Sequence, residues 1–269
     1  DTVPSNKSLI LATYRLGLCY ERKIGTERNE KEAYNCYKAI YKQYKPAQIR
    51  YALILEKGCK GITAQPNSAF ELYKELSPNT TNLKDDSKIS LNEAEALFHV
   101  ARCYAHKIGC SGTIEVDEIR KYLKIALSNG CEEARYELAI IEYNHDKENA
   151  NKYCLQAALR DNYDACYTYA IHNMKAEGRN LETLNNSYNL LKEASKHNHH
   201  GAEFLLSHFY WNGIFVQKNR EEAEKLLQRS NFKRAEVSNS NPHSKEASLF
   251  LGWYYDTYQN NRDKAIKHY

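Results

Sequence analysis

The feature that most constrains this chain is a short apolar pattern that returns along its length. Its first copy consists of Ala12, Leu16, Gly17 and Tyr20. Steps of four, one and three residues place these side chains on one face of an α-helix. A second amphipathic helix follows, over Asn29 to Ile40, after a turn that contains Gly25. Such a helix pair cannot bury its apolar face alone, so it must stack on copies of itself.

The pattern occurs about seven times, which predicts a repeat protein with one helix pair in each unit. The first small residues of the units are Ala12, Ala47, Ala96, Ala134, Ala165, Ala202 and Ala247. A second small residue follows five positions later, and it lets two helix backbones approach closely. We therefore predict an all-α fold, a right-handed α/α solenoid that forms a single domain over residues 1–269. Two long unit spacings place polar surface loops at 77–93 and 231–246.

Each second helix has a position that usually holds a small residue. A predicted capping position lies four residues before it. The small position holds Ala33, Ala69, Ala150, Ser187, Ala223 and Ala265, with Ile119 as the exception. The predicted N-caps, whose side chains accept hydrogen bonds from the first helical turn, are Asn29, Asp146, Thr183, Asn219 and Asn261. In the second unit Gln65 takes the capping position, and Pro66 is expected at the first helical residue.

These residues resemble the Sel1-like repeat, a relative of the tetratricopeptide repeat. The signature of that family is A-x-x-x-L-G-x-x-Y-x-x-G-x-G-V-x-x-D-x-x-K-A. The sixth unit matches it at Ala202, Leu206, Tyr210, Gly213, Val216, Asn219 and Ala223. The first unit matches at Ala12, Leu16, Gly17, Tyr20, Gly25 and Ala33. The resemblance implies a non-catalytic scaffold or adaptor that binds other proteins, and the stretch after Ala12 loosely resembles the fungal chitin synthase activators.

Composition excludes several other classes of protein. The formal net charge is +4, and acidic and basic residues alternate along the chain, so no basic stripe for nucleic acid is present. No apolar run is long enough to span a membrane. Residues 1–8 carry neither an initiator methionine nor the apolar core of a signal peptide, and we expect the chain to be a fragment of a longer protein.

The cysteines and histidines do not predict a metal or cofactor site. None of the eight cysteines forms a CxxC pair, and we expect reduced, structural thiols. The densest histidine cluster is His197, His199 and His200, with His208 further on. Such a tract can bind metal, but no acid or cysteine has ligand spacing to it, so we favour an exposed turn. No P-loop, GxGxxG or nucleophile elbow occurs, and we expect no enzyme activity, cofactor or metal.

The candidate site is a surface. In an α-solenoid the first helices line the concave side, and residues two and six positions after the first small residue should point toward it. We call this surface the first-helix face. Its predicted partner-binding residues are Tyr14, Leu18, Phe98, Arg102, Tyr136, Tyr167, Phe204, His208 and Trp253, together with Trp211, which lies one turn beyond His208. Tyrosine, tryptophan and arginine dominate the contact energy of protein interfaces.

We therefore predict that the chain binds another protein or a peptide segment. The resemblance to the Sel1-like repeat implies that this binding regulates or activates a membrane-associated enzyme complex such as chitin synthase. We expect a cytoplasmic location, peripheral to a membrane through the partner. Sequons at Asn6, Asn79 and Asn185 leave the endoplasmic reticulum lumen and secretion open. The alternatives are an adaptor of the luminal degradation machinery, a bacterial host-interaction factor, and a solenoid that binds a small ligand or a cell-wall fragment.

Overall fold

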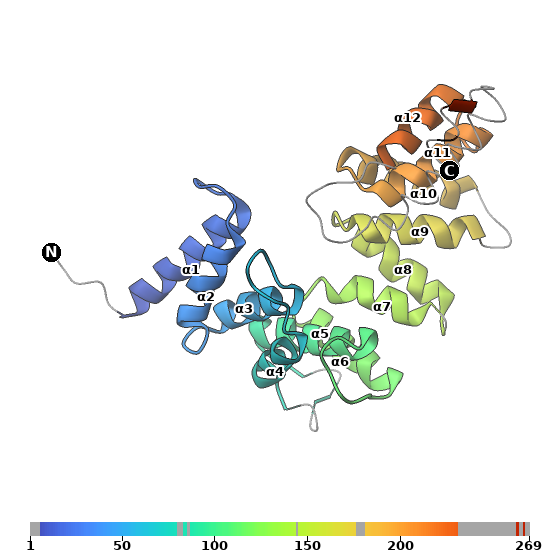
Figure 1. Ribbon diagram of the computed structural model, residues 1–269. Helices are drawn as coiled ribbons and strands as arrows, with labels where there is room; N and C mark the ends of the chain where they lie inside the picture. Colours follow the sequence, from blue (N-terminus) through green and yellow to red (C-terminus); the bar gives the residue numbers. More distant parts are fainter. Residues whose placement is uncertain are drawn as a thin grey trace. The chain divides into compact units, whose positions relative to one another are not determined.

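A computed structural model describes residues 6–79, 83–84, 87–143, 145–175, 181–230, 262–263 and 266. Within these residues the regular elements are twelve α-helices (Figure 1). The chain divides into two compact units, Asp1–Ile141 and Glu142–Tyr269. The seventh predicted repeat lies almost wholly outside the described residues, as do the 231–246 loop and the predicted cap Asn261.

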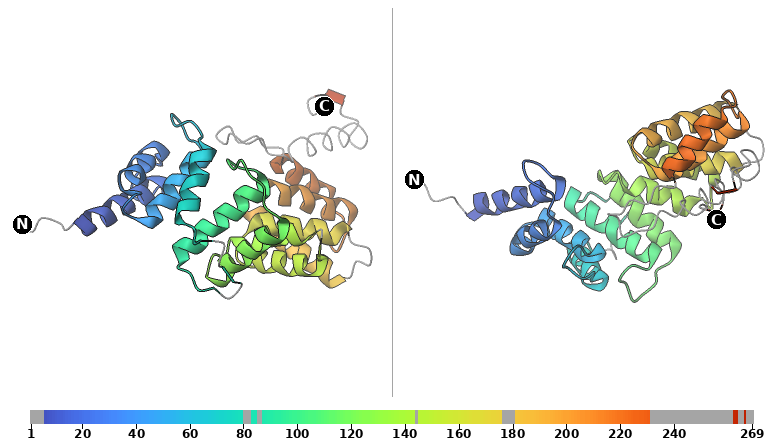
Figure 2. Two further views of the ribbon diagram at one scale, coloured as in Figure 1. Left: turned by 90° about the horizontal axis from the view of Figure 1, so that it is seen from below. Right: turned by 45° about the horizontal axis from the view of Figure 1, so that its top comes forward.

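The first compact unit contains three helix pairs and one further helix. The helices are α1 (Asn6–Arg22), α2 (Glu30–Ile40), α3 (Lys45–Lys57), α4 (Pro66–Leu76), α5 (Leu91–His106), α6 (Val116–Ser128) and α7 (Ala134–Glu142). Each pair packs together, and each of α2 and α4 also packs on the helix that follows it (Figure 2). The first helices α3 and α5 contact each other as well, which places these two first helices on the same side of the unit.

The second compact unit repeats this arrangement. Its helices are α8 (Lys147–Ala158), α9 (Tyr163–Lys175), α10 (Leu181–Lys196), α11 (His200–Asn212) and α12 (Arg220–Ser230). Here α9 pairs with α10 and α11 with α12, while α9 and α11 contact each other. The predicted all-α solenoid fold is therefore confirmed, whereas a single domain over the whole chain stays a prediction. No helix in the described ranges is long and apolar enough to cross a membrane.

The small residues occupy the close contacts that the repeat pattern predicts. Ala47, Ala52, Ala96, Ala101 and their equivalents in the later described repeats are buried. At Gly17, a Cβ atom would lie only 2.6 Å from Cε1 of Tyr37, a ring that is itself fully buried. The prediction was wrong for Ala12 and Leu16, which are exposed, Leu16 by 47%. Among the described residues, no helix precedes α1 to cover the face that interior repeats bury against their predecessor.

The helix starts confirm most of the predicted caps. The side chains of Asn29, Asp146 and Asn219 accept backbone N–H groups of the first turns of α2, α8 and α12. Thr183 was a wrong assignment, because α10 already begins at Leu181. The 77–93 loop was predicted too long as well, since Ser90 caps α5 in a reciprocal capping box with Glu93.

Candidate protein-binding surfaces

The first-helix face of the first compact unit is only partly exposed. Tyr14 is half-buried and packs against the rings of Tyr37 and Tyr44, with centroid distances of 5.9 and 5.0 Å. Leu18 and Tyr136 are half-buried. These three side chains keep area that a partner can contact, while their buried parts hold them in place.

Phe98, Trp211 and Arg102 take a larger part in the fold than the sequence suggested. Phe98 and Trp211 are buried, each 8% exposed, so little of either side chain is left for a partner to contact. The Arg102 side chain, 18% exposed, donates to the Glu56 carboxylate at 2.5 Å. Removing either member of that pair would leave a poorly solvated charge, so Arg102 stabilises the fold whatever else it contacts.

The Arg102 ion pair belongs to a polar arrangement that two successive repeats share. In the first, the Tyr37 hydroxyl donates to the Glu21 carboxylate at 2.6 Å, and Arg50 lies 3.3 Å from it. In the second, the Tyr73 hydroxyl donates to Glu56 at 3.2 Å, to which Arg102 also donates. Burial first, and then the adjacent carboxylate, raises the pKa of Tyr73, so the hydroxyl stays protonated and serves as a donor.

His99 packs against Tyr73, the tyrosine of this second set of hydrogen bonds. Its ring stacks on Tyr73 with centroids 4.5 Å apart, and it is 9% exposed. Burial, followed by the charges of Arg102, Arg50 and Lys57, lowers the pKa of His99 to about 3. Its Nδ1 has no hydrogen-bond partner among the described residues. His99 is therefore a neutral ring in the core of this unit.

In the second compact unit, three predicted residues take part in contacts between an aromatic ring and a histidine ring. Tyr167 and His199 have ring centroids 5.9 Å apart, and Phe204 meets His208 edge-on at 4.9 Å. All four side chains are half-buried, and burial lowers the pKa of His208. This cluster is the aromatic part of the first-helix face in this unit. Trp253, the last predicted contact, lies outside the described residues.

Each histidine of the tract has a structural partner. His199 caps α11 by accepting the Ala202 N–H through Nδ1, and its Nε2 lies 3.0 Å from Asp164. His200 lies 3.0 Å from Glu203, a buried carboxylate that Arg229 also contacts at 2.6 Å. In the part of the chain that the structure describes, no three metal-ligating side chains come together. His199 is thus a helix cap, and it and His200 each lie beside a carboxylate.

The thiols are placed as core residues. All eight cysteines are free, and four of them are buried: Cys103, Cys131, Cys154 and Cys166. Burial raises the pKa of Cys103 and Cys154 to about 12 and that of Cys166 to about 11. A thiol with so high a pKa has little thiolate at neutral pH and is a poor nucleophile.

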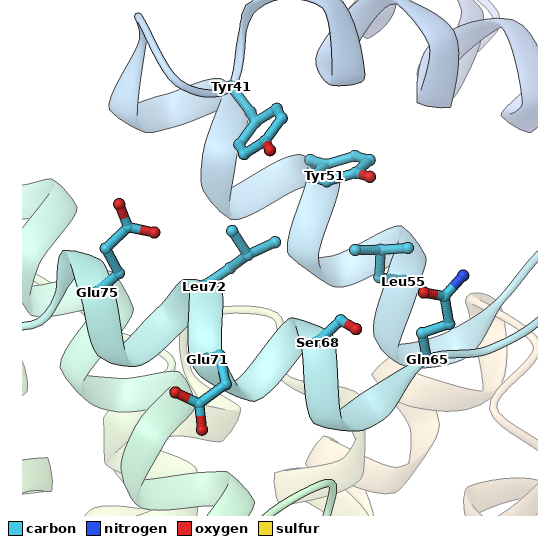
Figure 3. Close-up of a pocket in the computed structure, with 8 residues that line it drawn as sticks. All are labelled: Tyr41, Tyr51, Leu55, Gln65, Ser68, Glu71, Leu72 and Glu75. Atoms are coloured by element: carbon cyan, nitrogen blue, oxygen red, sulfur yellow. The ribbon is translucent and has the colours of Figure 1, made fainter.

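A second surface was not predicted from the sequence. It is an open groove of about 510 Å³ between the end of α2, α3 and α4, which we call the α3/α4 groove (Figure 3). Its lining residues are Tyr41, Tyr51, Leu55, Gln65, Ser68, Glu71, Leu72 and Glu75. Figure 3 shows Leu72 directed toward the rings of Tyr41 and Tyr51, with Glu75 beside them and Glu71 on the outer side of α4.

Two features of the second repeat could have suggested the groove from the sequence. Tyr51 stands where most other units place an aliphatic residue, and it stacks on Tyr41 with centroids 4.8 Å apart. Glu71 and Glu75 lie one turn apart on α4 and both line the groove, Glu75 on the side of the rings and Glu71 at the outer edge. The packing pattern alone does not reveal that these two features face the same hollow.

Comparison with known proteins agrees with the repeat pattern. The family model of the Sel1 repeat matches residues 10–43, 45–76 and 200–230, segments that lie in both compact units. No curated protein sequence matches the chain. These findings give no support to the predicted resemblance to chitin synthase activators.

Two solved structures show the same fold. A Sel1 repeat protein from Oxalobacter formigenes has a TM-score of 0.63 at 22% identity, over 88% of this chain and 90% of that one. A protective antigen of uropathogenic Escherichia coli, which displays an SLR fold, has a TM-score of 0.61 at 16% identity. The match to the antigen covers 98% of this chain but only 53% of the antigen, so the chain spans about half of its length.

Proposed function

We propose that this chain is a non-catalytic scaffold that binds another protein through the first-helix face. The observation that supports this function best is the contrast between neighbouring positions of the first helices. The small residues Ala134 and Ala165 are fully buried, whereas Tyr136 and Tyr167, two positions further on, keep part of their rings exposed. Half-exposed aromatic side chains on a rigid helix offer large contact area at little cost in conformational entropy. Sel1 repeats generally bind proteins, which agrees with this role.

The finer proposal is that the bound protein belongs to a membrane-associated enzyme complex, with chitin synthase as the example that the stretch after Ala12 suggests. The alternatives are a luminal degradation adaptor, a secreted bacterial host-interaction factor, and binding of a small ligand or cell-wall fragment. The eight free, largely helical cysteines favour a reducing compartment. A thiol titration of the native-source protein under denaturing conditions separates these cases, because eight titratable thiols contradict an oxidising location.

Site-specific photo-crosslinking tests the scaffold function. A photoreactive amino acid replaces Tyr136 or Tyr167 on the first-helix face, and Lys124 or Lys152, both exposed on second helices, serves as the matched control. We expect the two tyrosine positions to give a crosslink to the same protein in cells and the lysine positions to give none. Crosslinks of equal yield from the lysine positions would contradict the assignment of the binding face.

A further inference from the structure

The α3/α4 groove combines an apolar wall with uncompensated negative charge. Tyr41, Tyr51 and Leu72 are half-buried, and each leaves part of its apolar surface open to the groove. Glu71 and Glu75 are exposed, and within the described ranges neither carboxylate forms an ion pair. The hydrogen bond of Glu75 is a long one, with Gln48 Nε2 donating at 3.3 Å. A carboxylate has room for further donors, so Glu75 can accept a cation as well.

This combination suits a long basic side chain. Lysine and arginine lay their methylene stems on apolar surface while the charged head stays near water or a counter-ion. In the groove the stem would lie over Tyr51 and Leu72, and the head would reach Glu75 or, at the outer edge, Glu71. A hollow of about 510 Å³ has room for one or two such side chains together with a neighbouring apolar residue.

We propose that the α3/α4 groove binds a segment of a partner protein in which basic residues alternate with aliphatic ones. This inference rests on the proposed scaffold function, but it concerns a different surface, formed by the end of α2 together with α3 and α4. The charge of the groove sets the choice of partner, because an acidic segment would meet two like charges at Glu71 and Glu75.

One cation lies next to the groove and has to be taken into account. Lys42 Nζ is 5.9 Å from the ring centroid of Tyr41. Lys42 would repel the head group of a basic segment but attract an acidic one. Replacing Lys42 with alanine therefore distinguishes the two kinds of partner without touching the carboxylates.

The test uses defined peptides and the whole chain. The probe is the acetylated, amidated peptide Gly-Leu-Lys-Leu-Arg-Leu-Gly, titrated by isothermal calorimetry at low ionic strength. Its control carries Glu in place of Lys and Arg. The groove variant is Glu71→Gln with Glu75→Gln, and the matched control variant is Glu148→Gln with Glu182→Gln, which removes the same charge from exposed positions elsewhere. Circular dichroism verifies the fold of each protein.

We expect the basic peptide to bind and the acidic peptide to bind at least about tenfold more weakly. The groove variant should weaken binding of the basic peptide about 3- to 10-fold, since each exposed charge pair contributes modestly. The control variant should stay within about twofold of the original chain, and Lys42→Ala should leave binding unchanged or tighten it. Equal losses in the two double variants, weaker binding by Lys42→Ala, or no binding at about 1 mM peptide would overturn the proposal.

A further variant separates this inference from the proposed function. Tyr136→Ala alters the first-helix face and leaves the groove residues in place. We expect it to bind the peptide as the original chain does. If Tyr136→Ala weakens peptide binding while the groove variant does not, the peptide lies on the first-helix face, which overturns the groove assignment but supports the scaffold function.

Discussion

The buried ring of His99 should make the first compact unit sensitive to acid. In the folded chain its pKa is about 3, against an ordinary histidine value near 6.5. Between these two values the unfolded chain binds a proton that the folded chain does not. The folded state is therefore favoured at neutral pH and loses stability as the pH falls below about 6.5. The perturbation that tests this is His99→Phe, which keeps a flat ring against Tyr73 but cannot be protonated.

The size of the effect follows from the two pKa values. At pH 4.5 the unfolded histidine is about two pH units below its own pKa and almost fully protonated, while the folded one is still neutral. At about 1.4 kcal/mol per unit, moving from pH 7.5 to 4.5 costs the original chain about 2 to 3 kcal/mol through this group alone. That is a large fraction of the stability of an ordinary domain.

The assay is urea unfolding of both proteins at pH 7.5 and 4.5, followed by circular dichroism. The informative quantity is the difference between the two proteins in the free energy lost on acidification. It cancels the protonation of all the other groups that both proteins share. We expect the original chain to lose about 2 to 3 kcal/mol more than His99→Phe. An equal loss in both would show that His99 is not the group responsible.

Further substitutions test the packing within each compact unit. Gly109 and Gly25 both have left-handed backbones, but a Cβ at Gly109 would lie 2.1 Å from the Pro66 carbonyl oxygen, whereas Gly25 has nothing within 4 Å. We expect Gly25→Ala to lower the free energy of unfolding by about 1 kcal/mol and Gly109→Ala to lower it clearly more. Thermal unfolding measures both losses. Equal losses would show that the close contact at Gly109 is absent. Arg229→Met removes the cation beside Glu203, whose side chain is 1% exposed, and should destabilise the second unit by about 1 to 3 kcal/mol. The double variant with Glu203→Gln should recover part of that loss, and no recovery in chemical denaturation would argue against the pair.

The sequence predicts the fold well because the repeats carry small residues at the same positions of their first helices. The small residue in the middle of the first helix is needed wherever a second helix approaches closely, as Gly17 and Tyr37 show. Among the described residues, the pattern fails at Leu16 and Ala12 of α1 and at one predicted cap. Leu16 is exposed because no described helix covers it, and Thr183 lies inside α10 although threonine is an ordinary capping residue.

The candidate site was harder to predict, because the repeat period indicates on which side of a helix a residue lies but not how deeply its side chain is buried. It places Phe98, Arg102 and Tyr136 on one side of the first helices. It does not say that Phe98 packs inward or that Arg102 pairs with Glu56, since both depend on which side chain the neighbouring repeat presents. The α3/α4 groove escaped prediction for the same reason.

Hydrogen exchange of the chain, alone and bound to the protein captured by crosslinking, tests the central claim most directly. The proposed function predicts slower amide exchange in the bound state along α5, α7, α9 and α11, the first helices of their pairs. The second helices α6, α10 and α12 should exchange at the same rate with and without the partner. Slower exchange confined to these second helices, with the first helices unchanged, would contradict binding through the first-helix face.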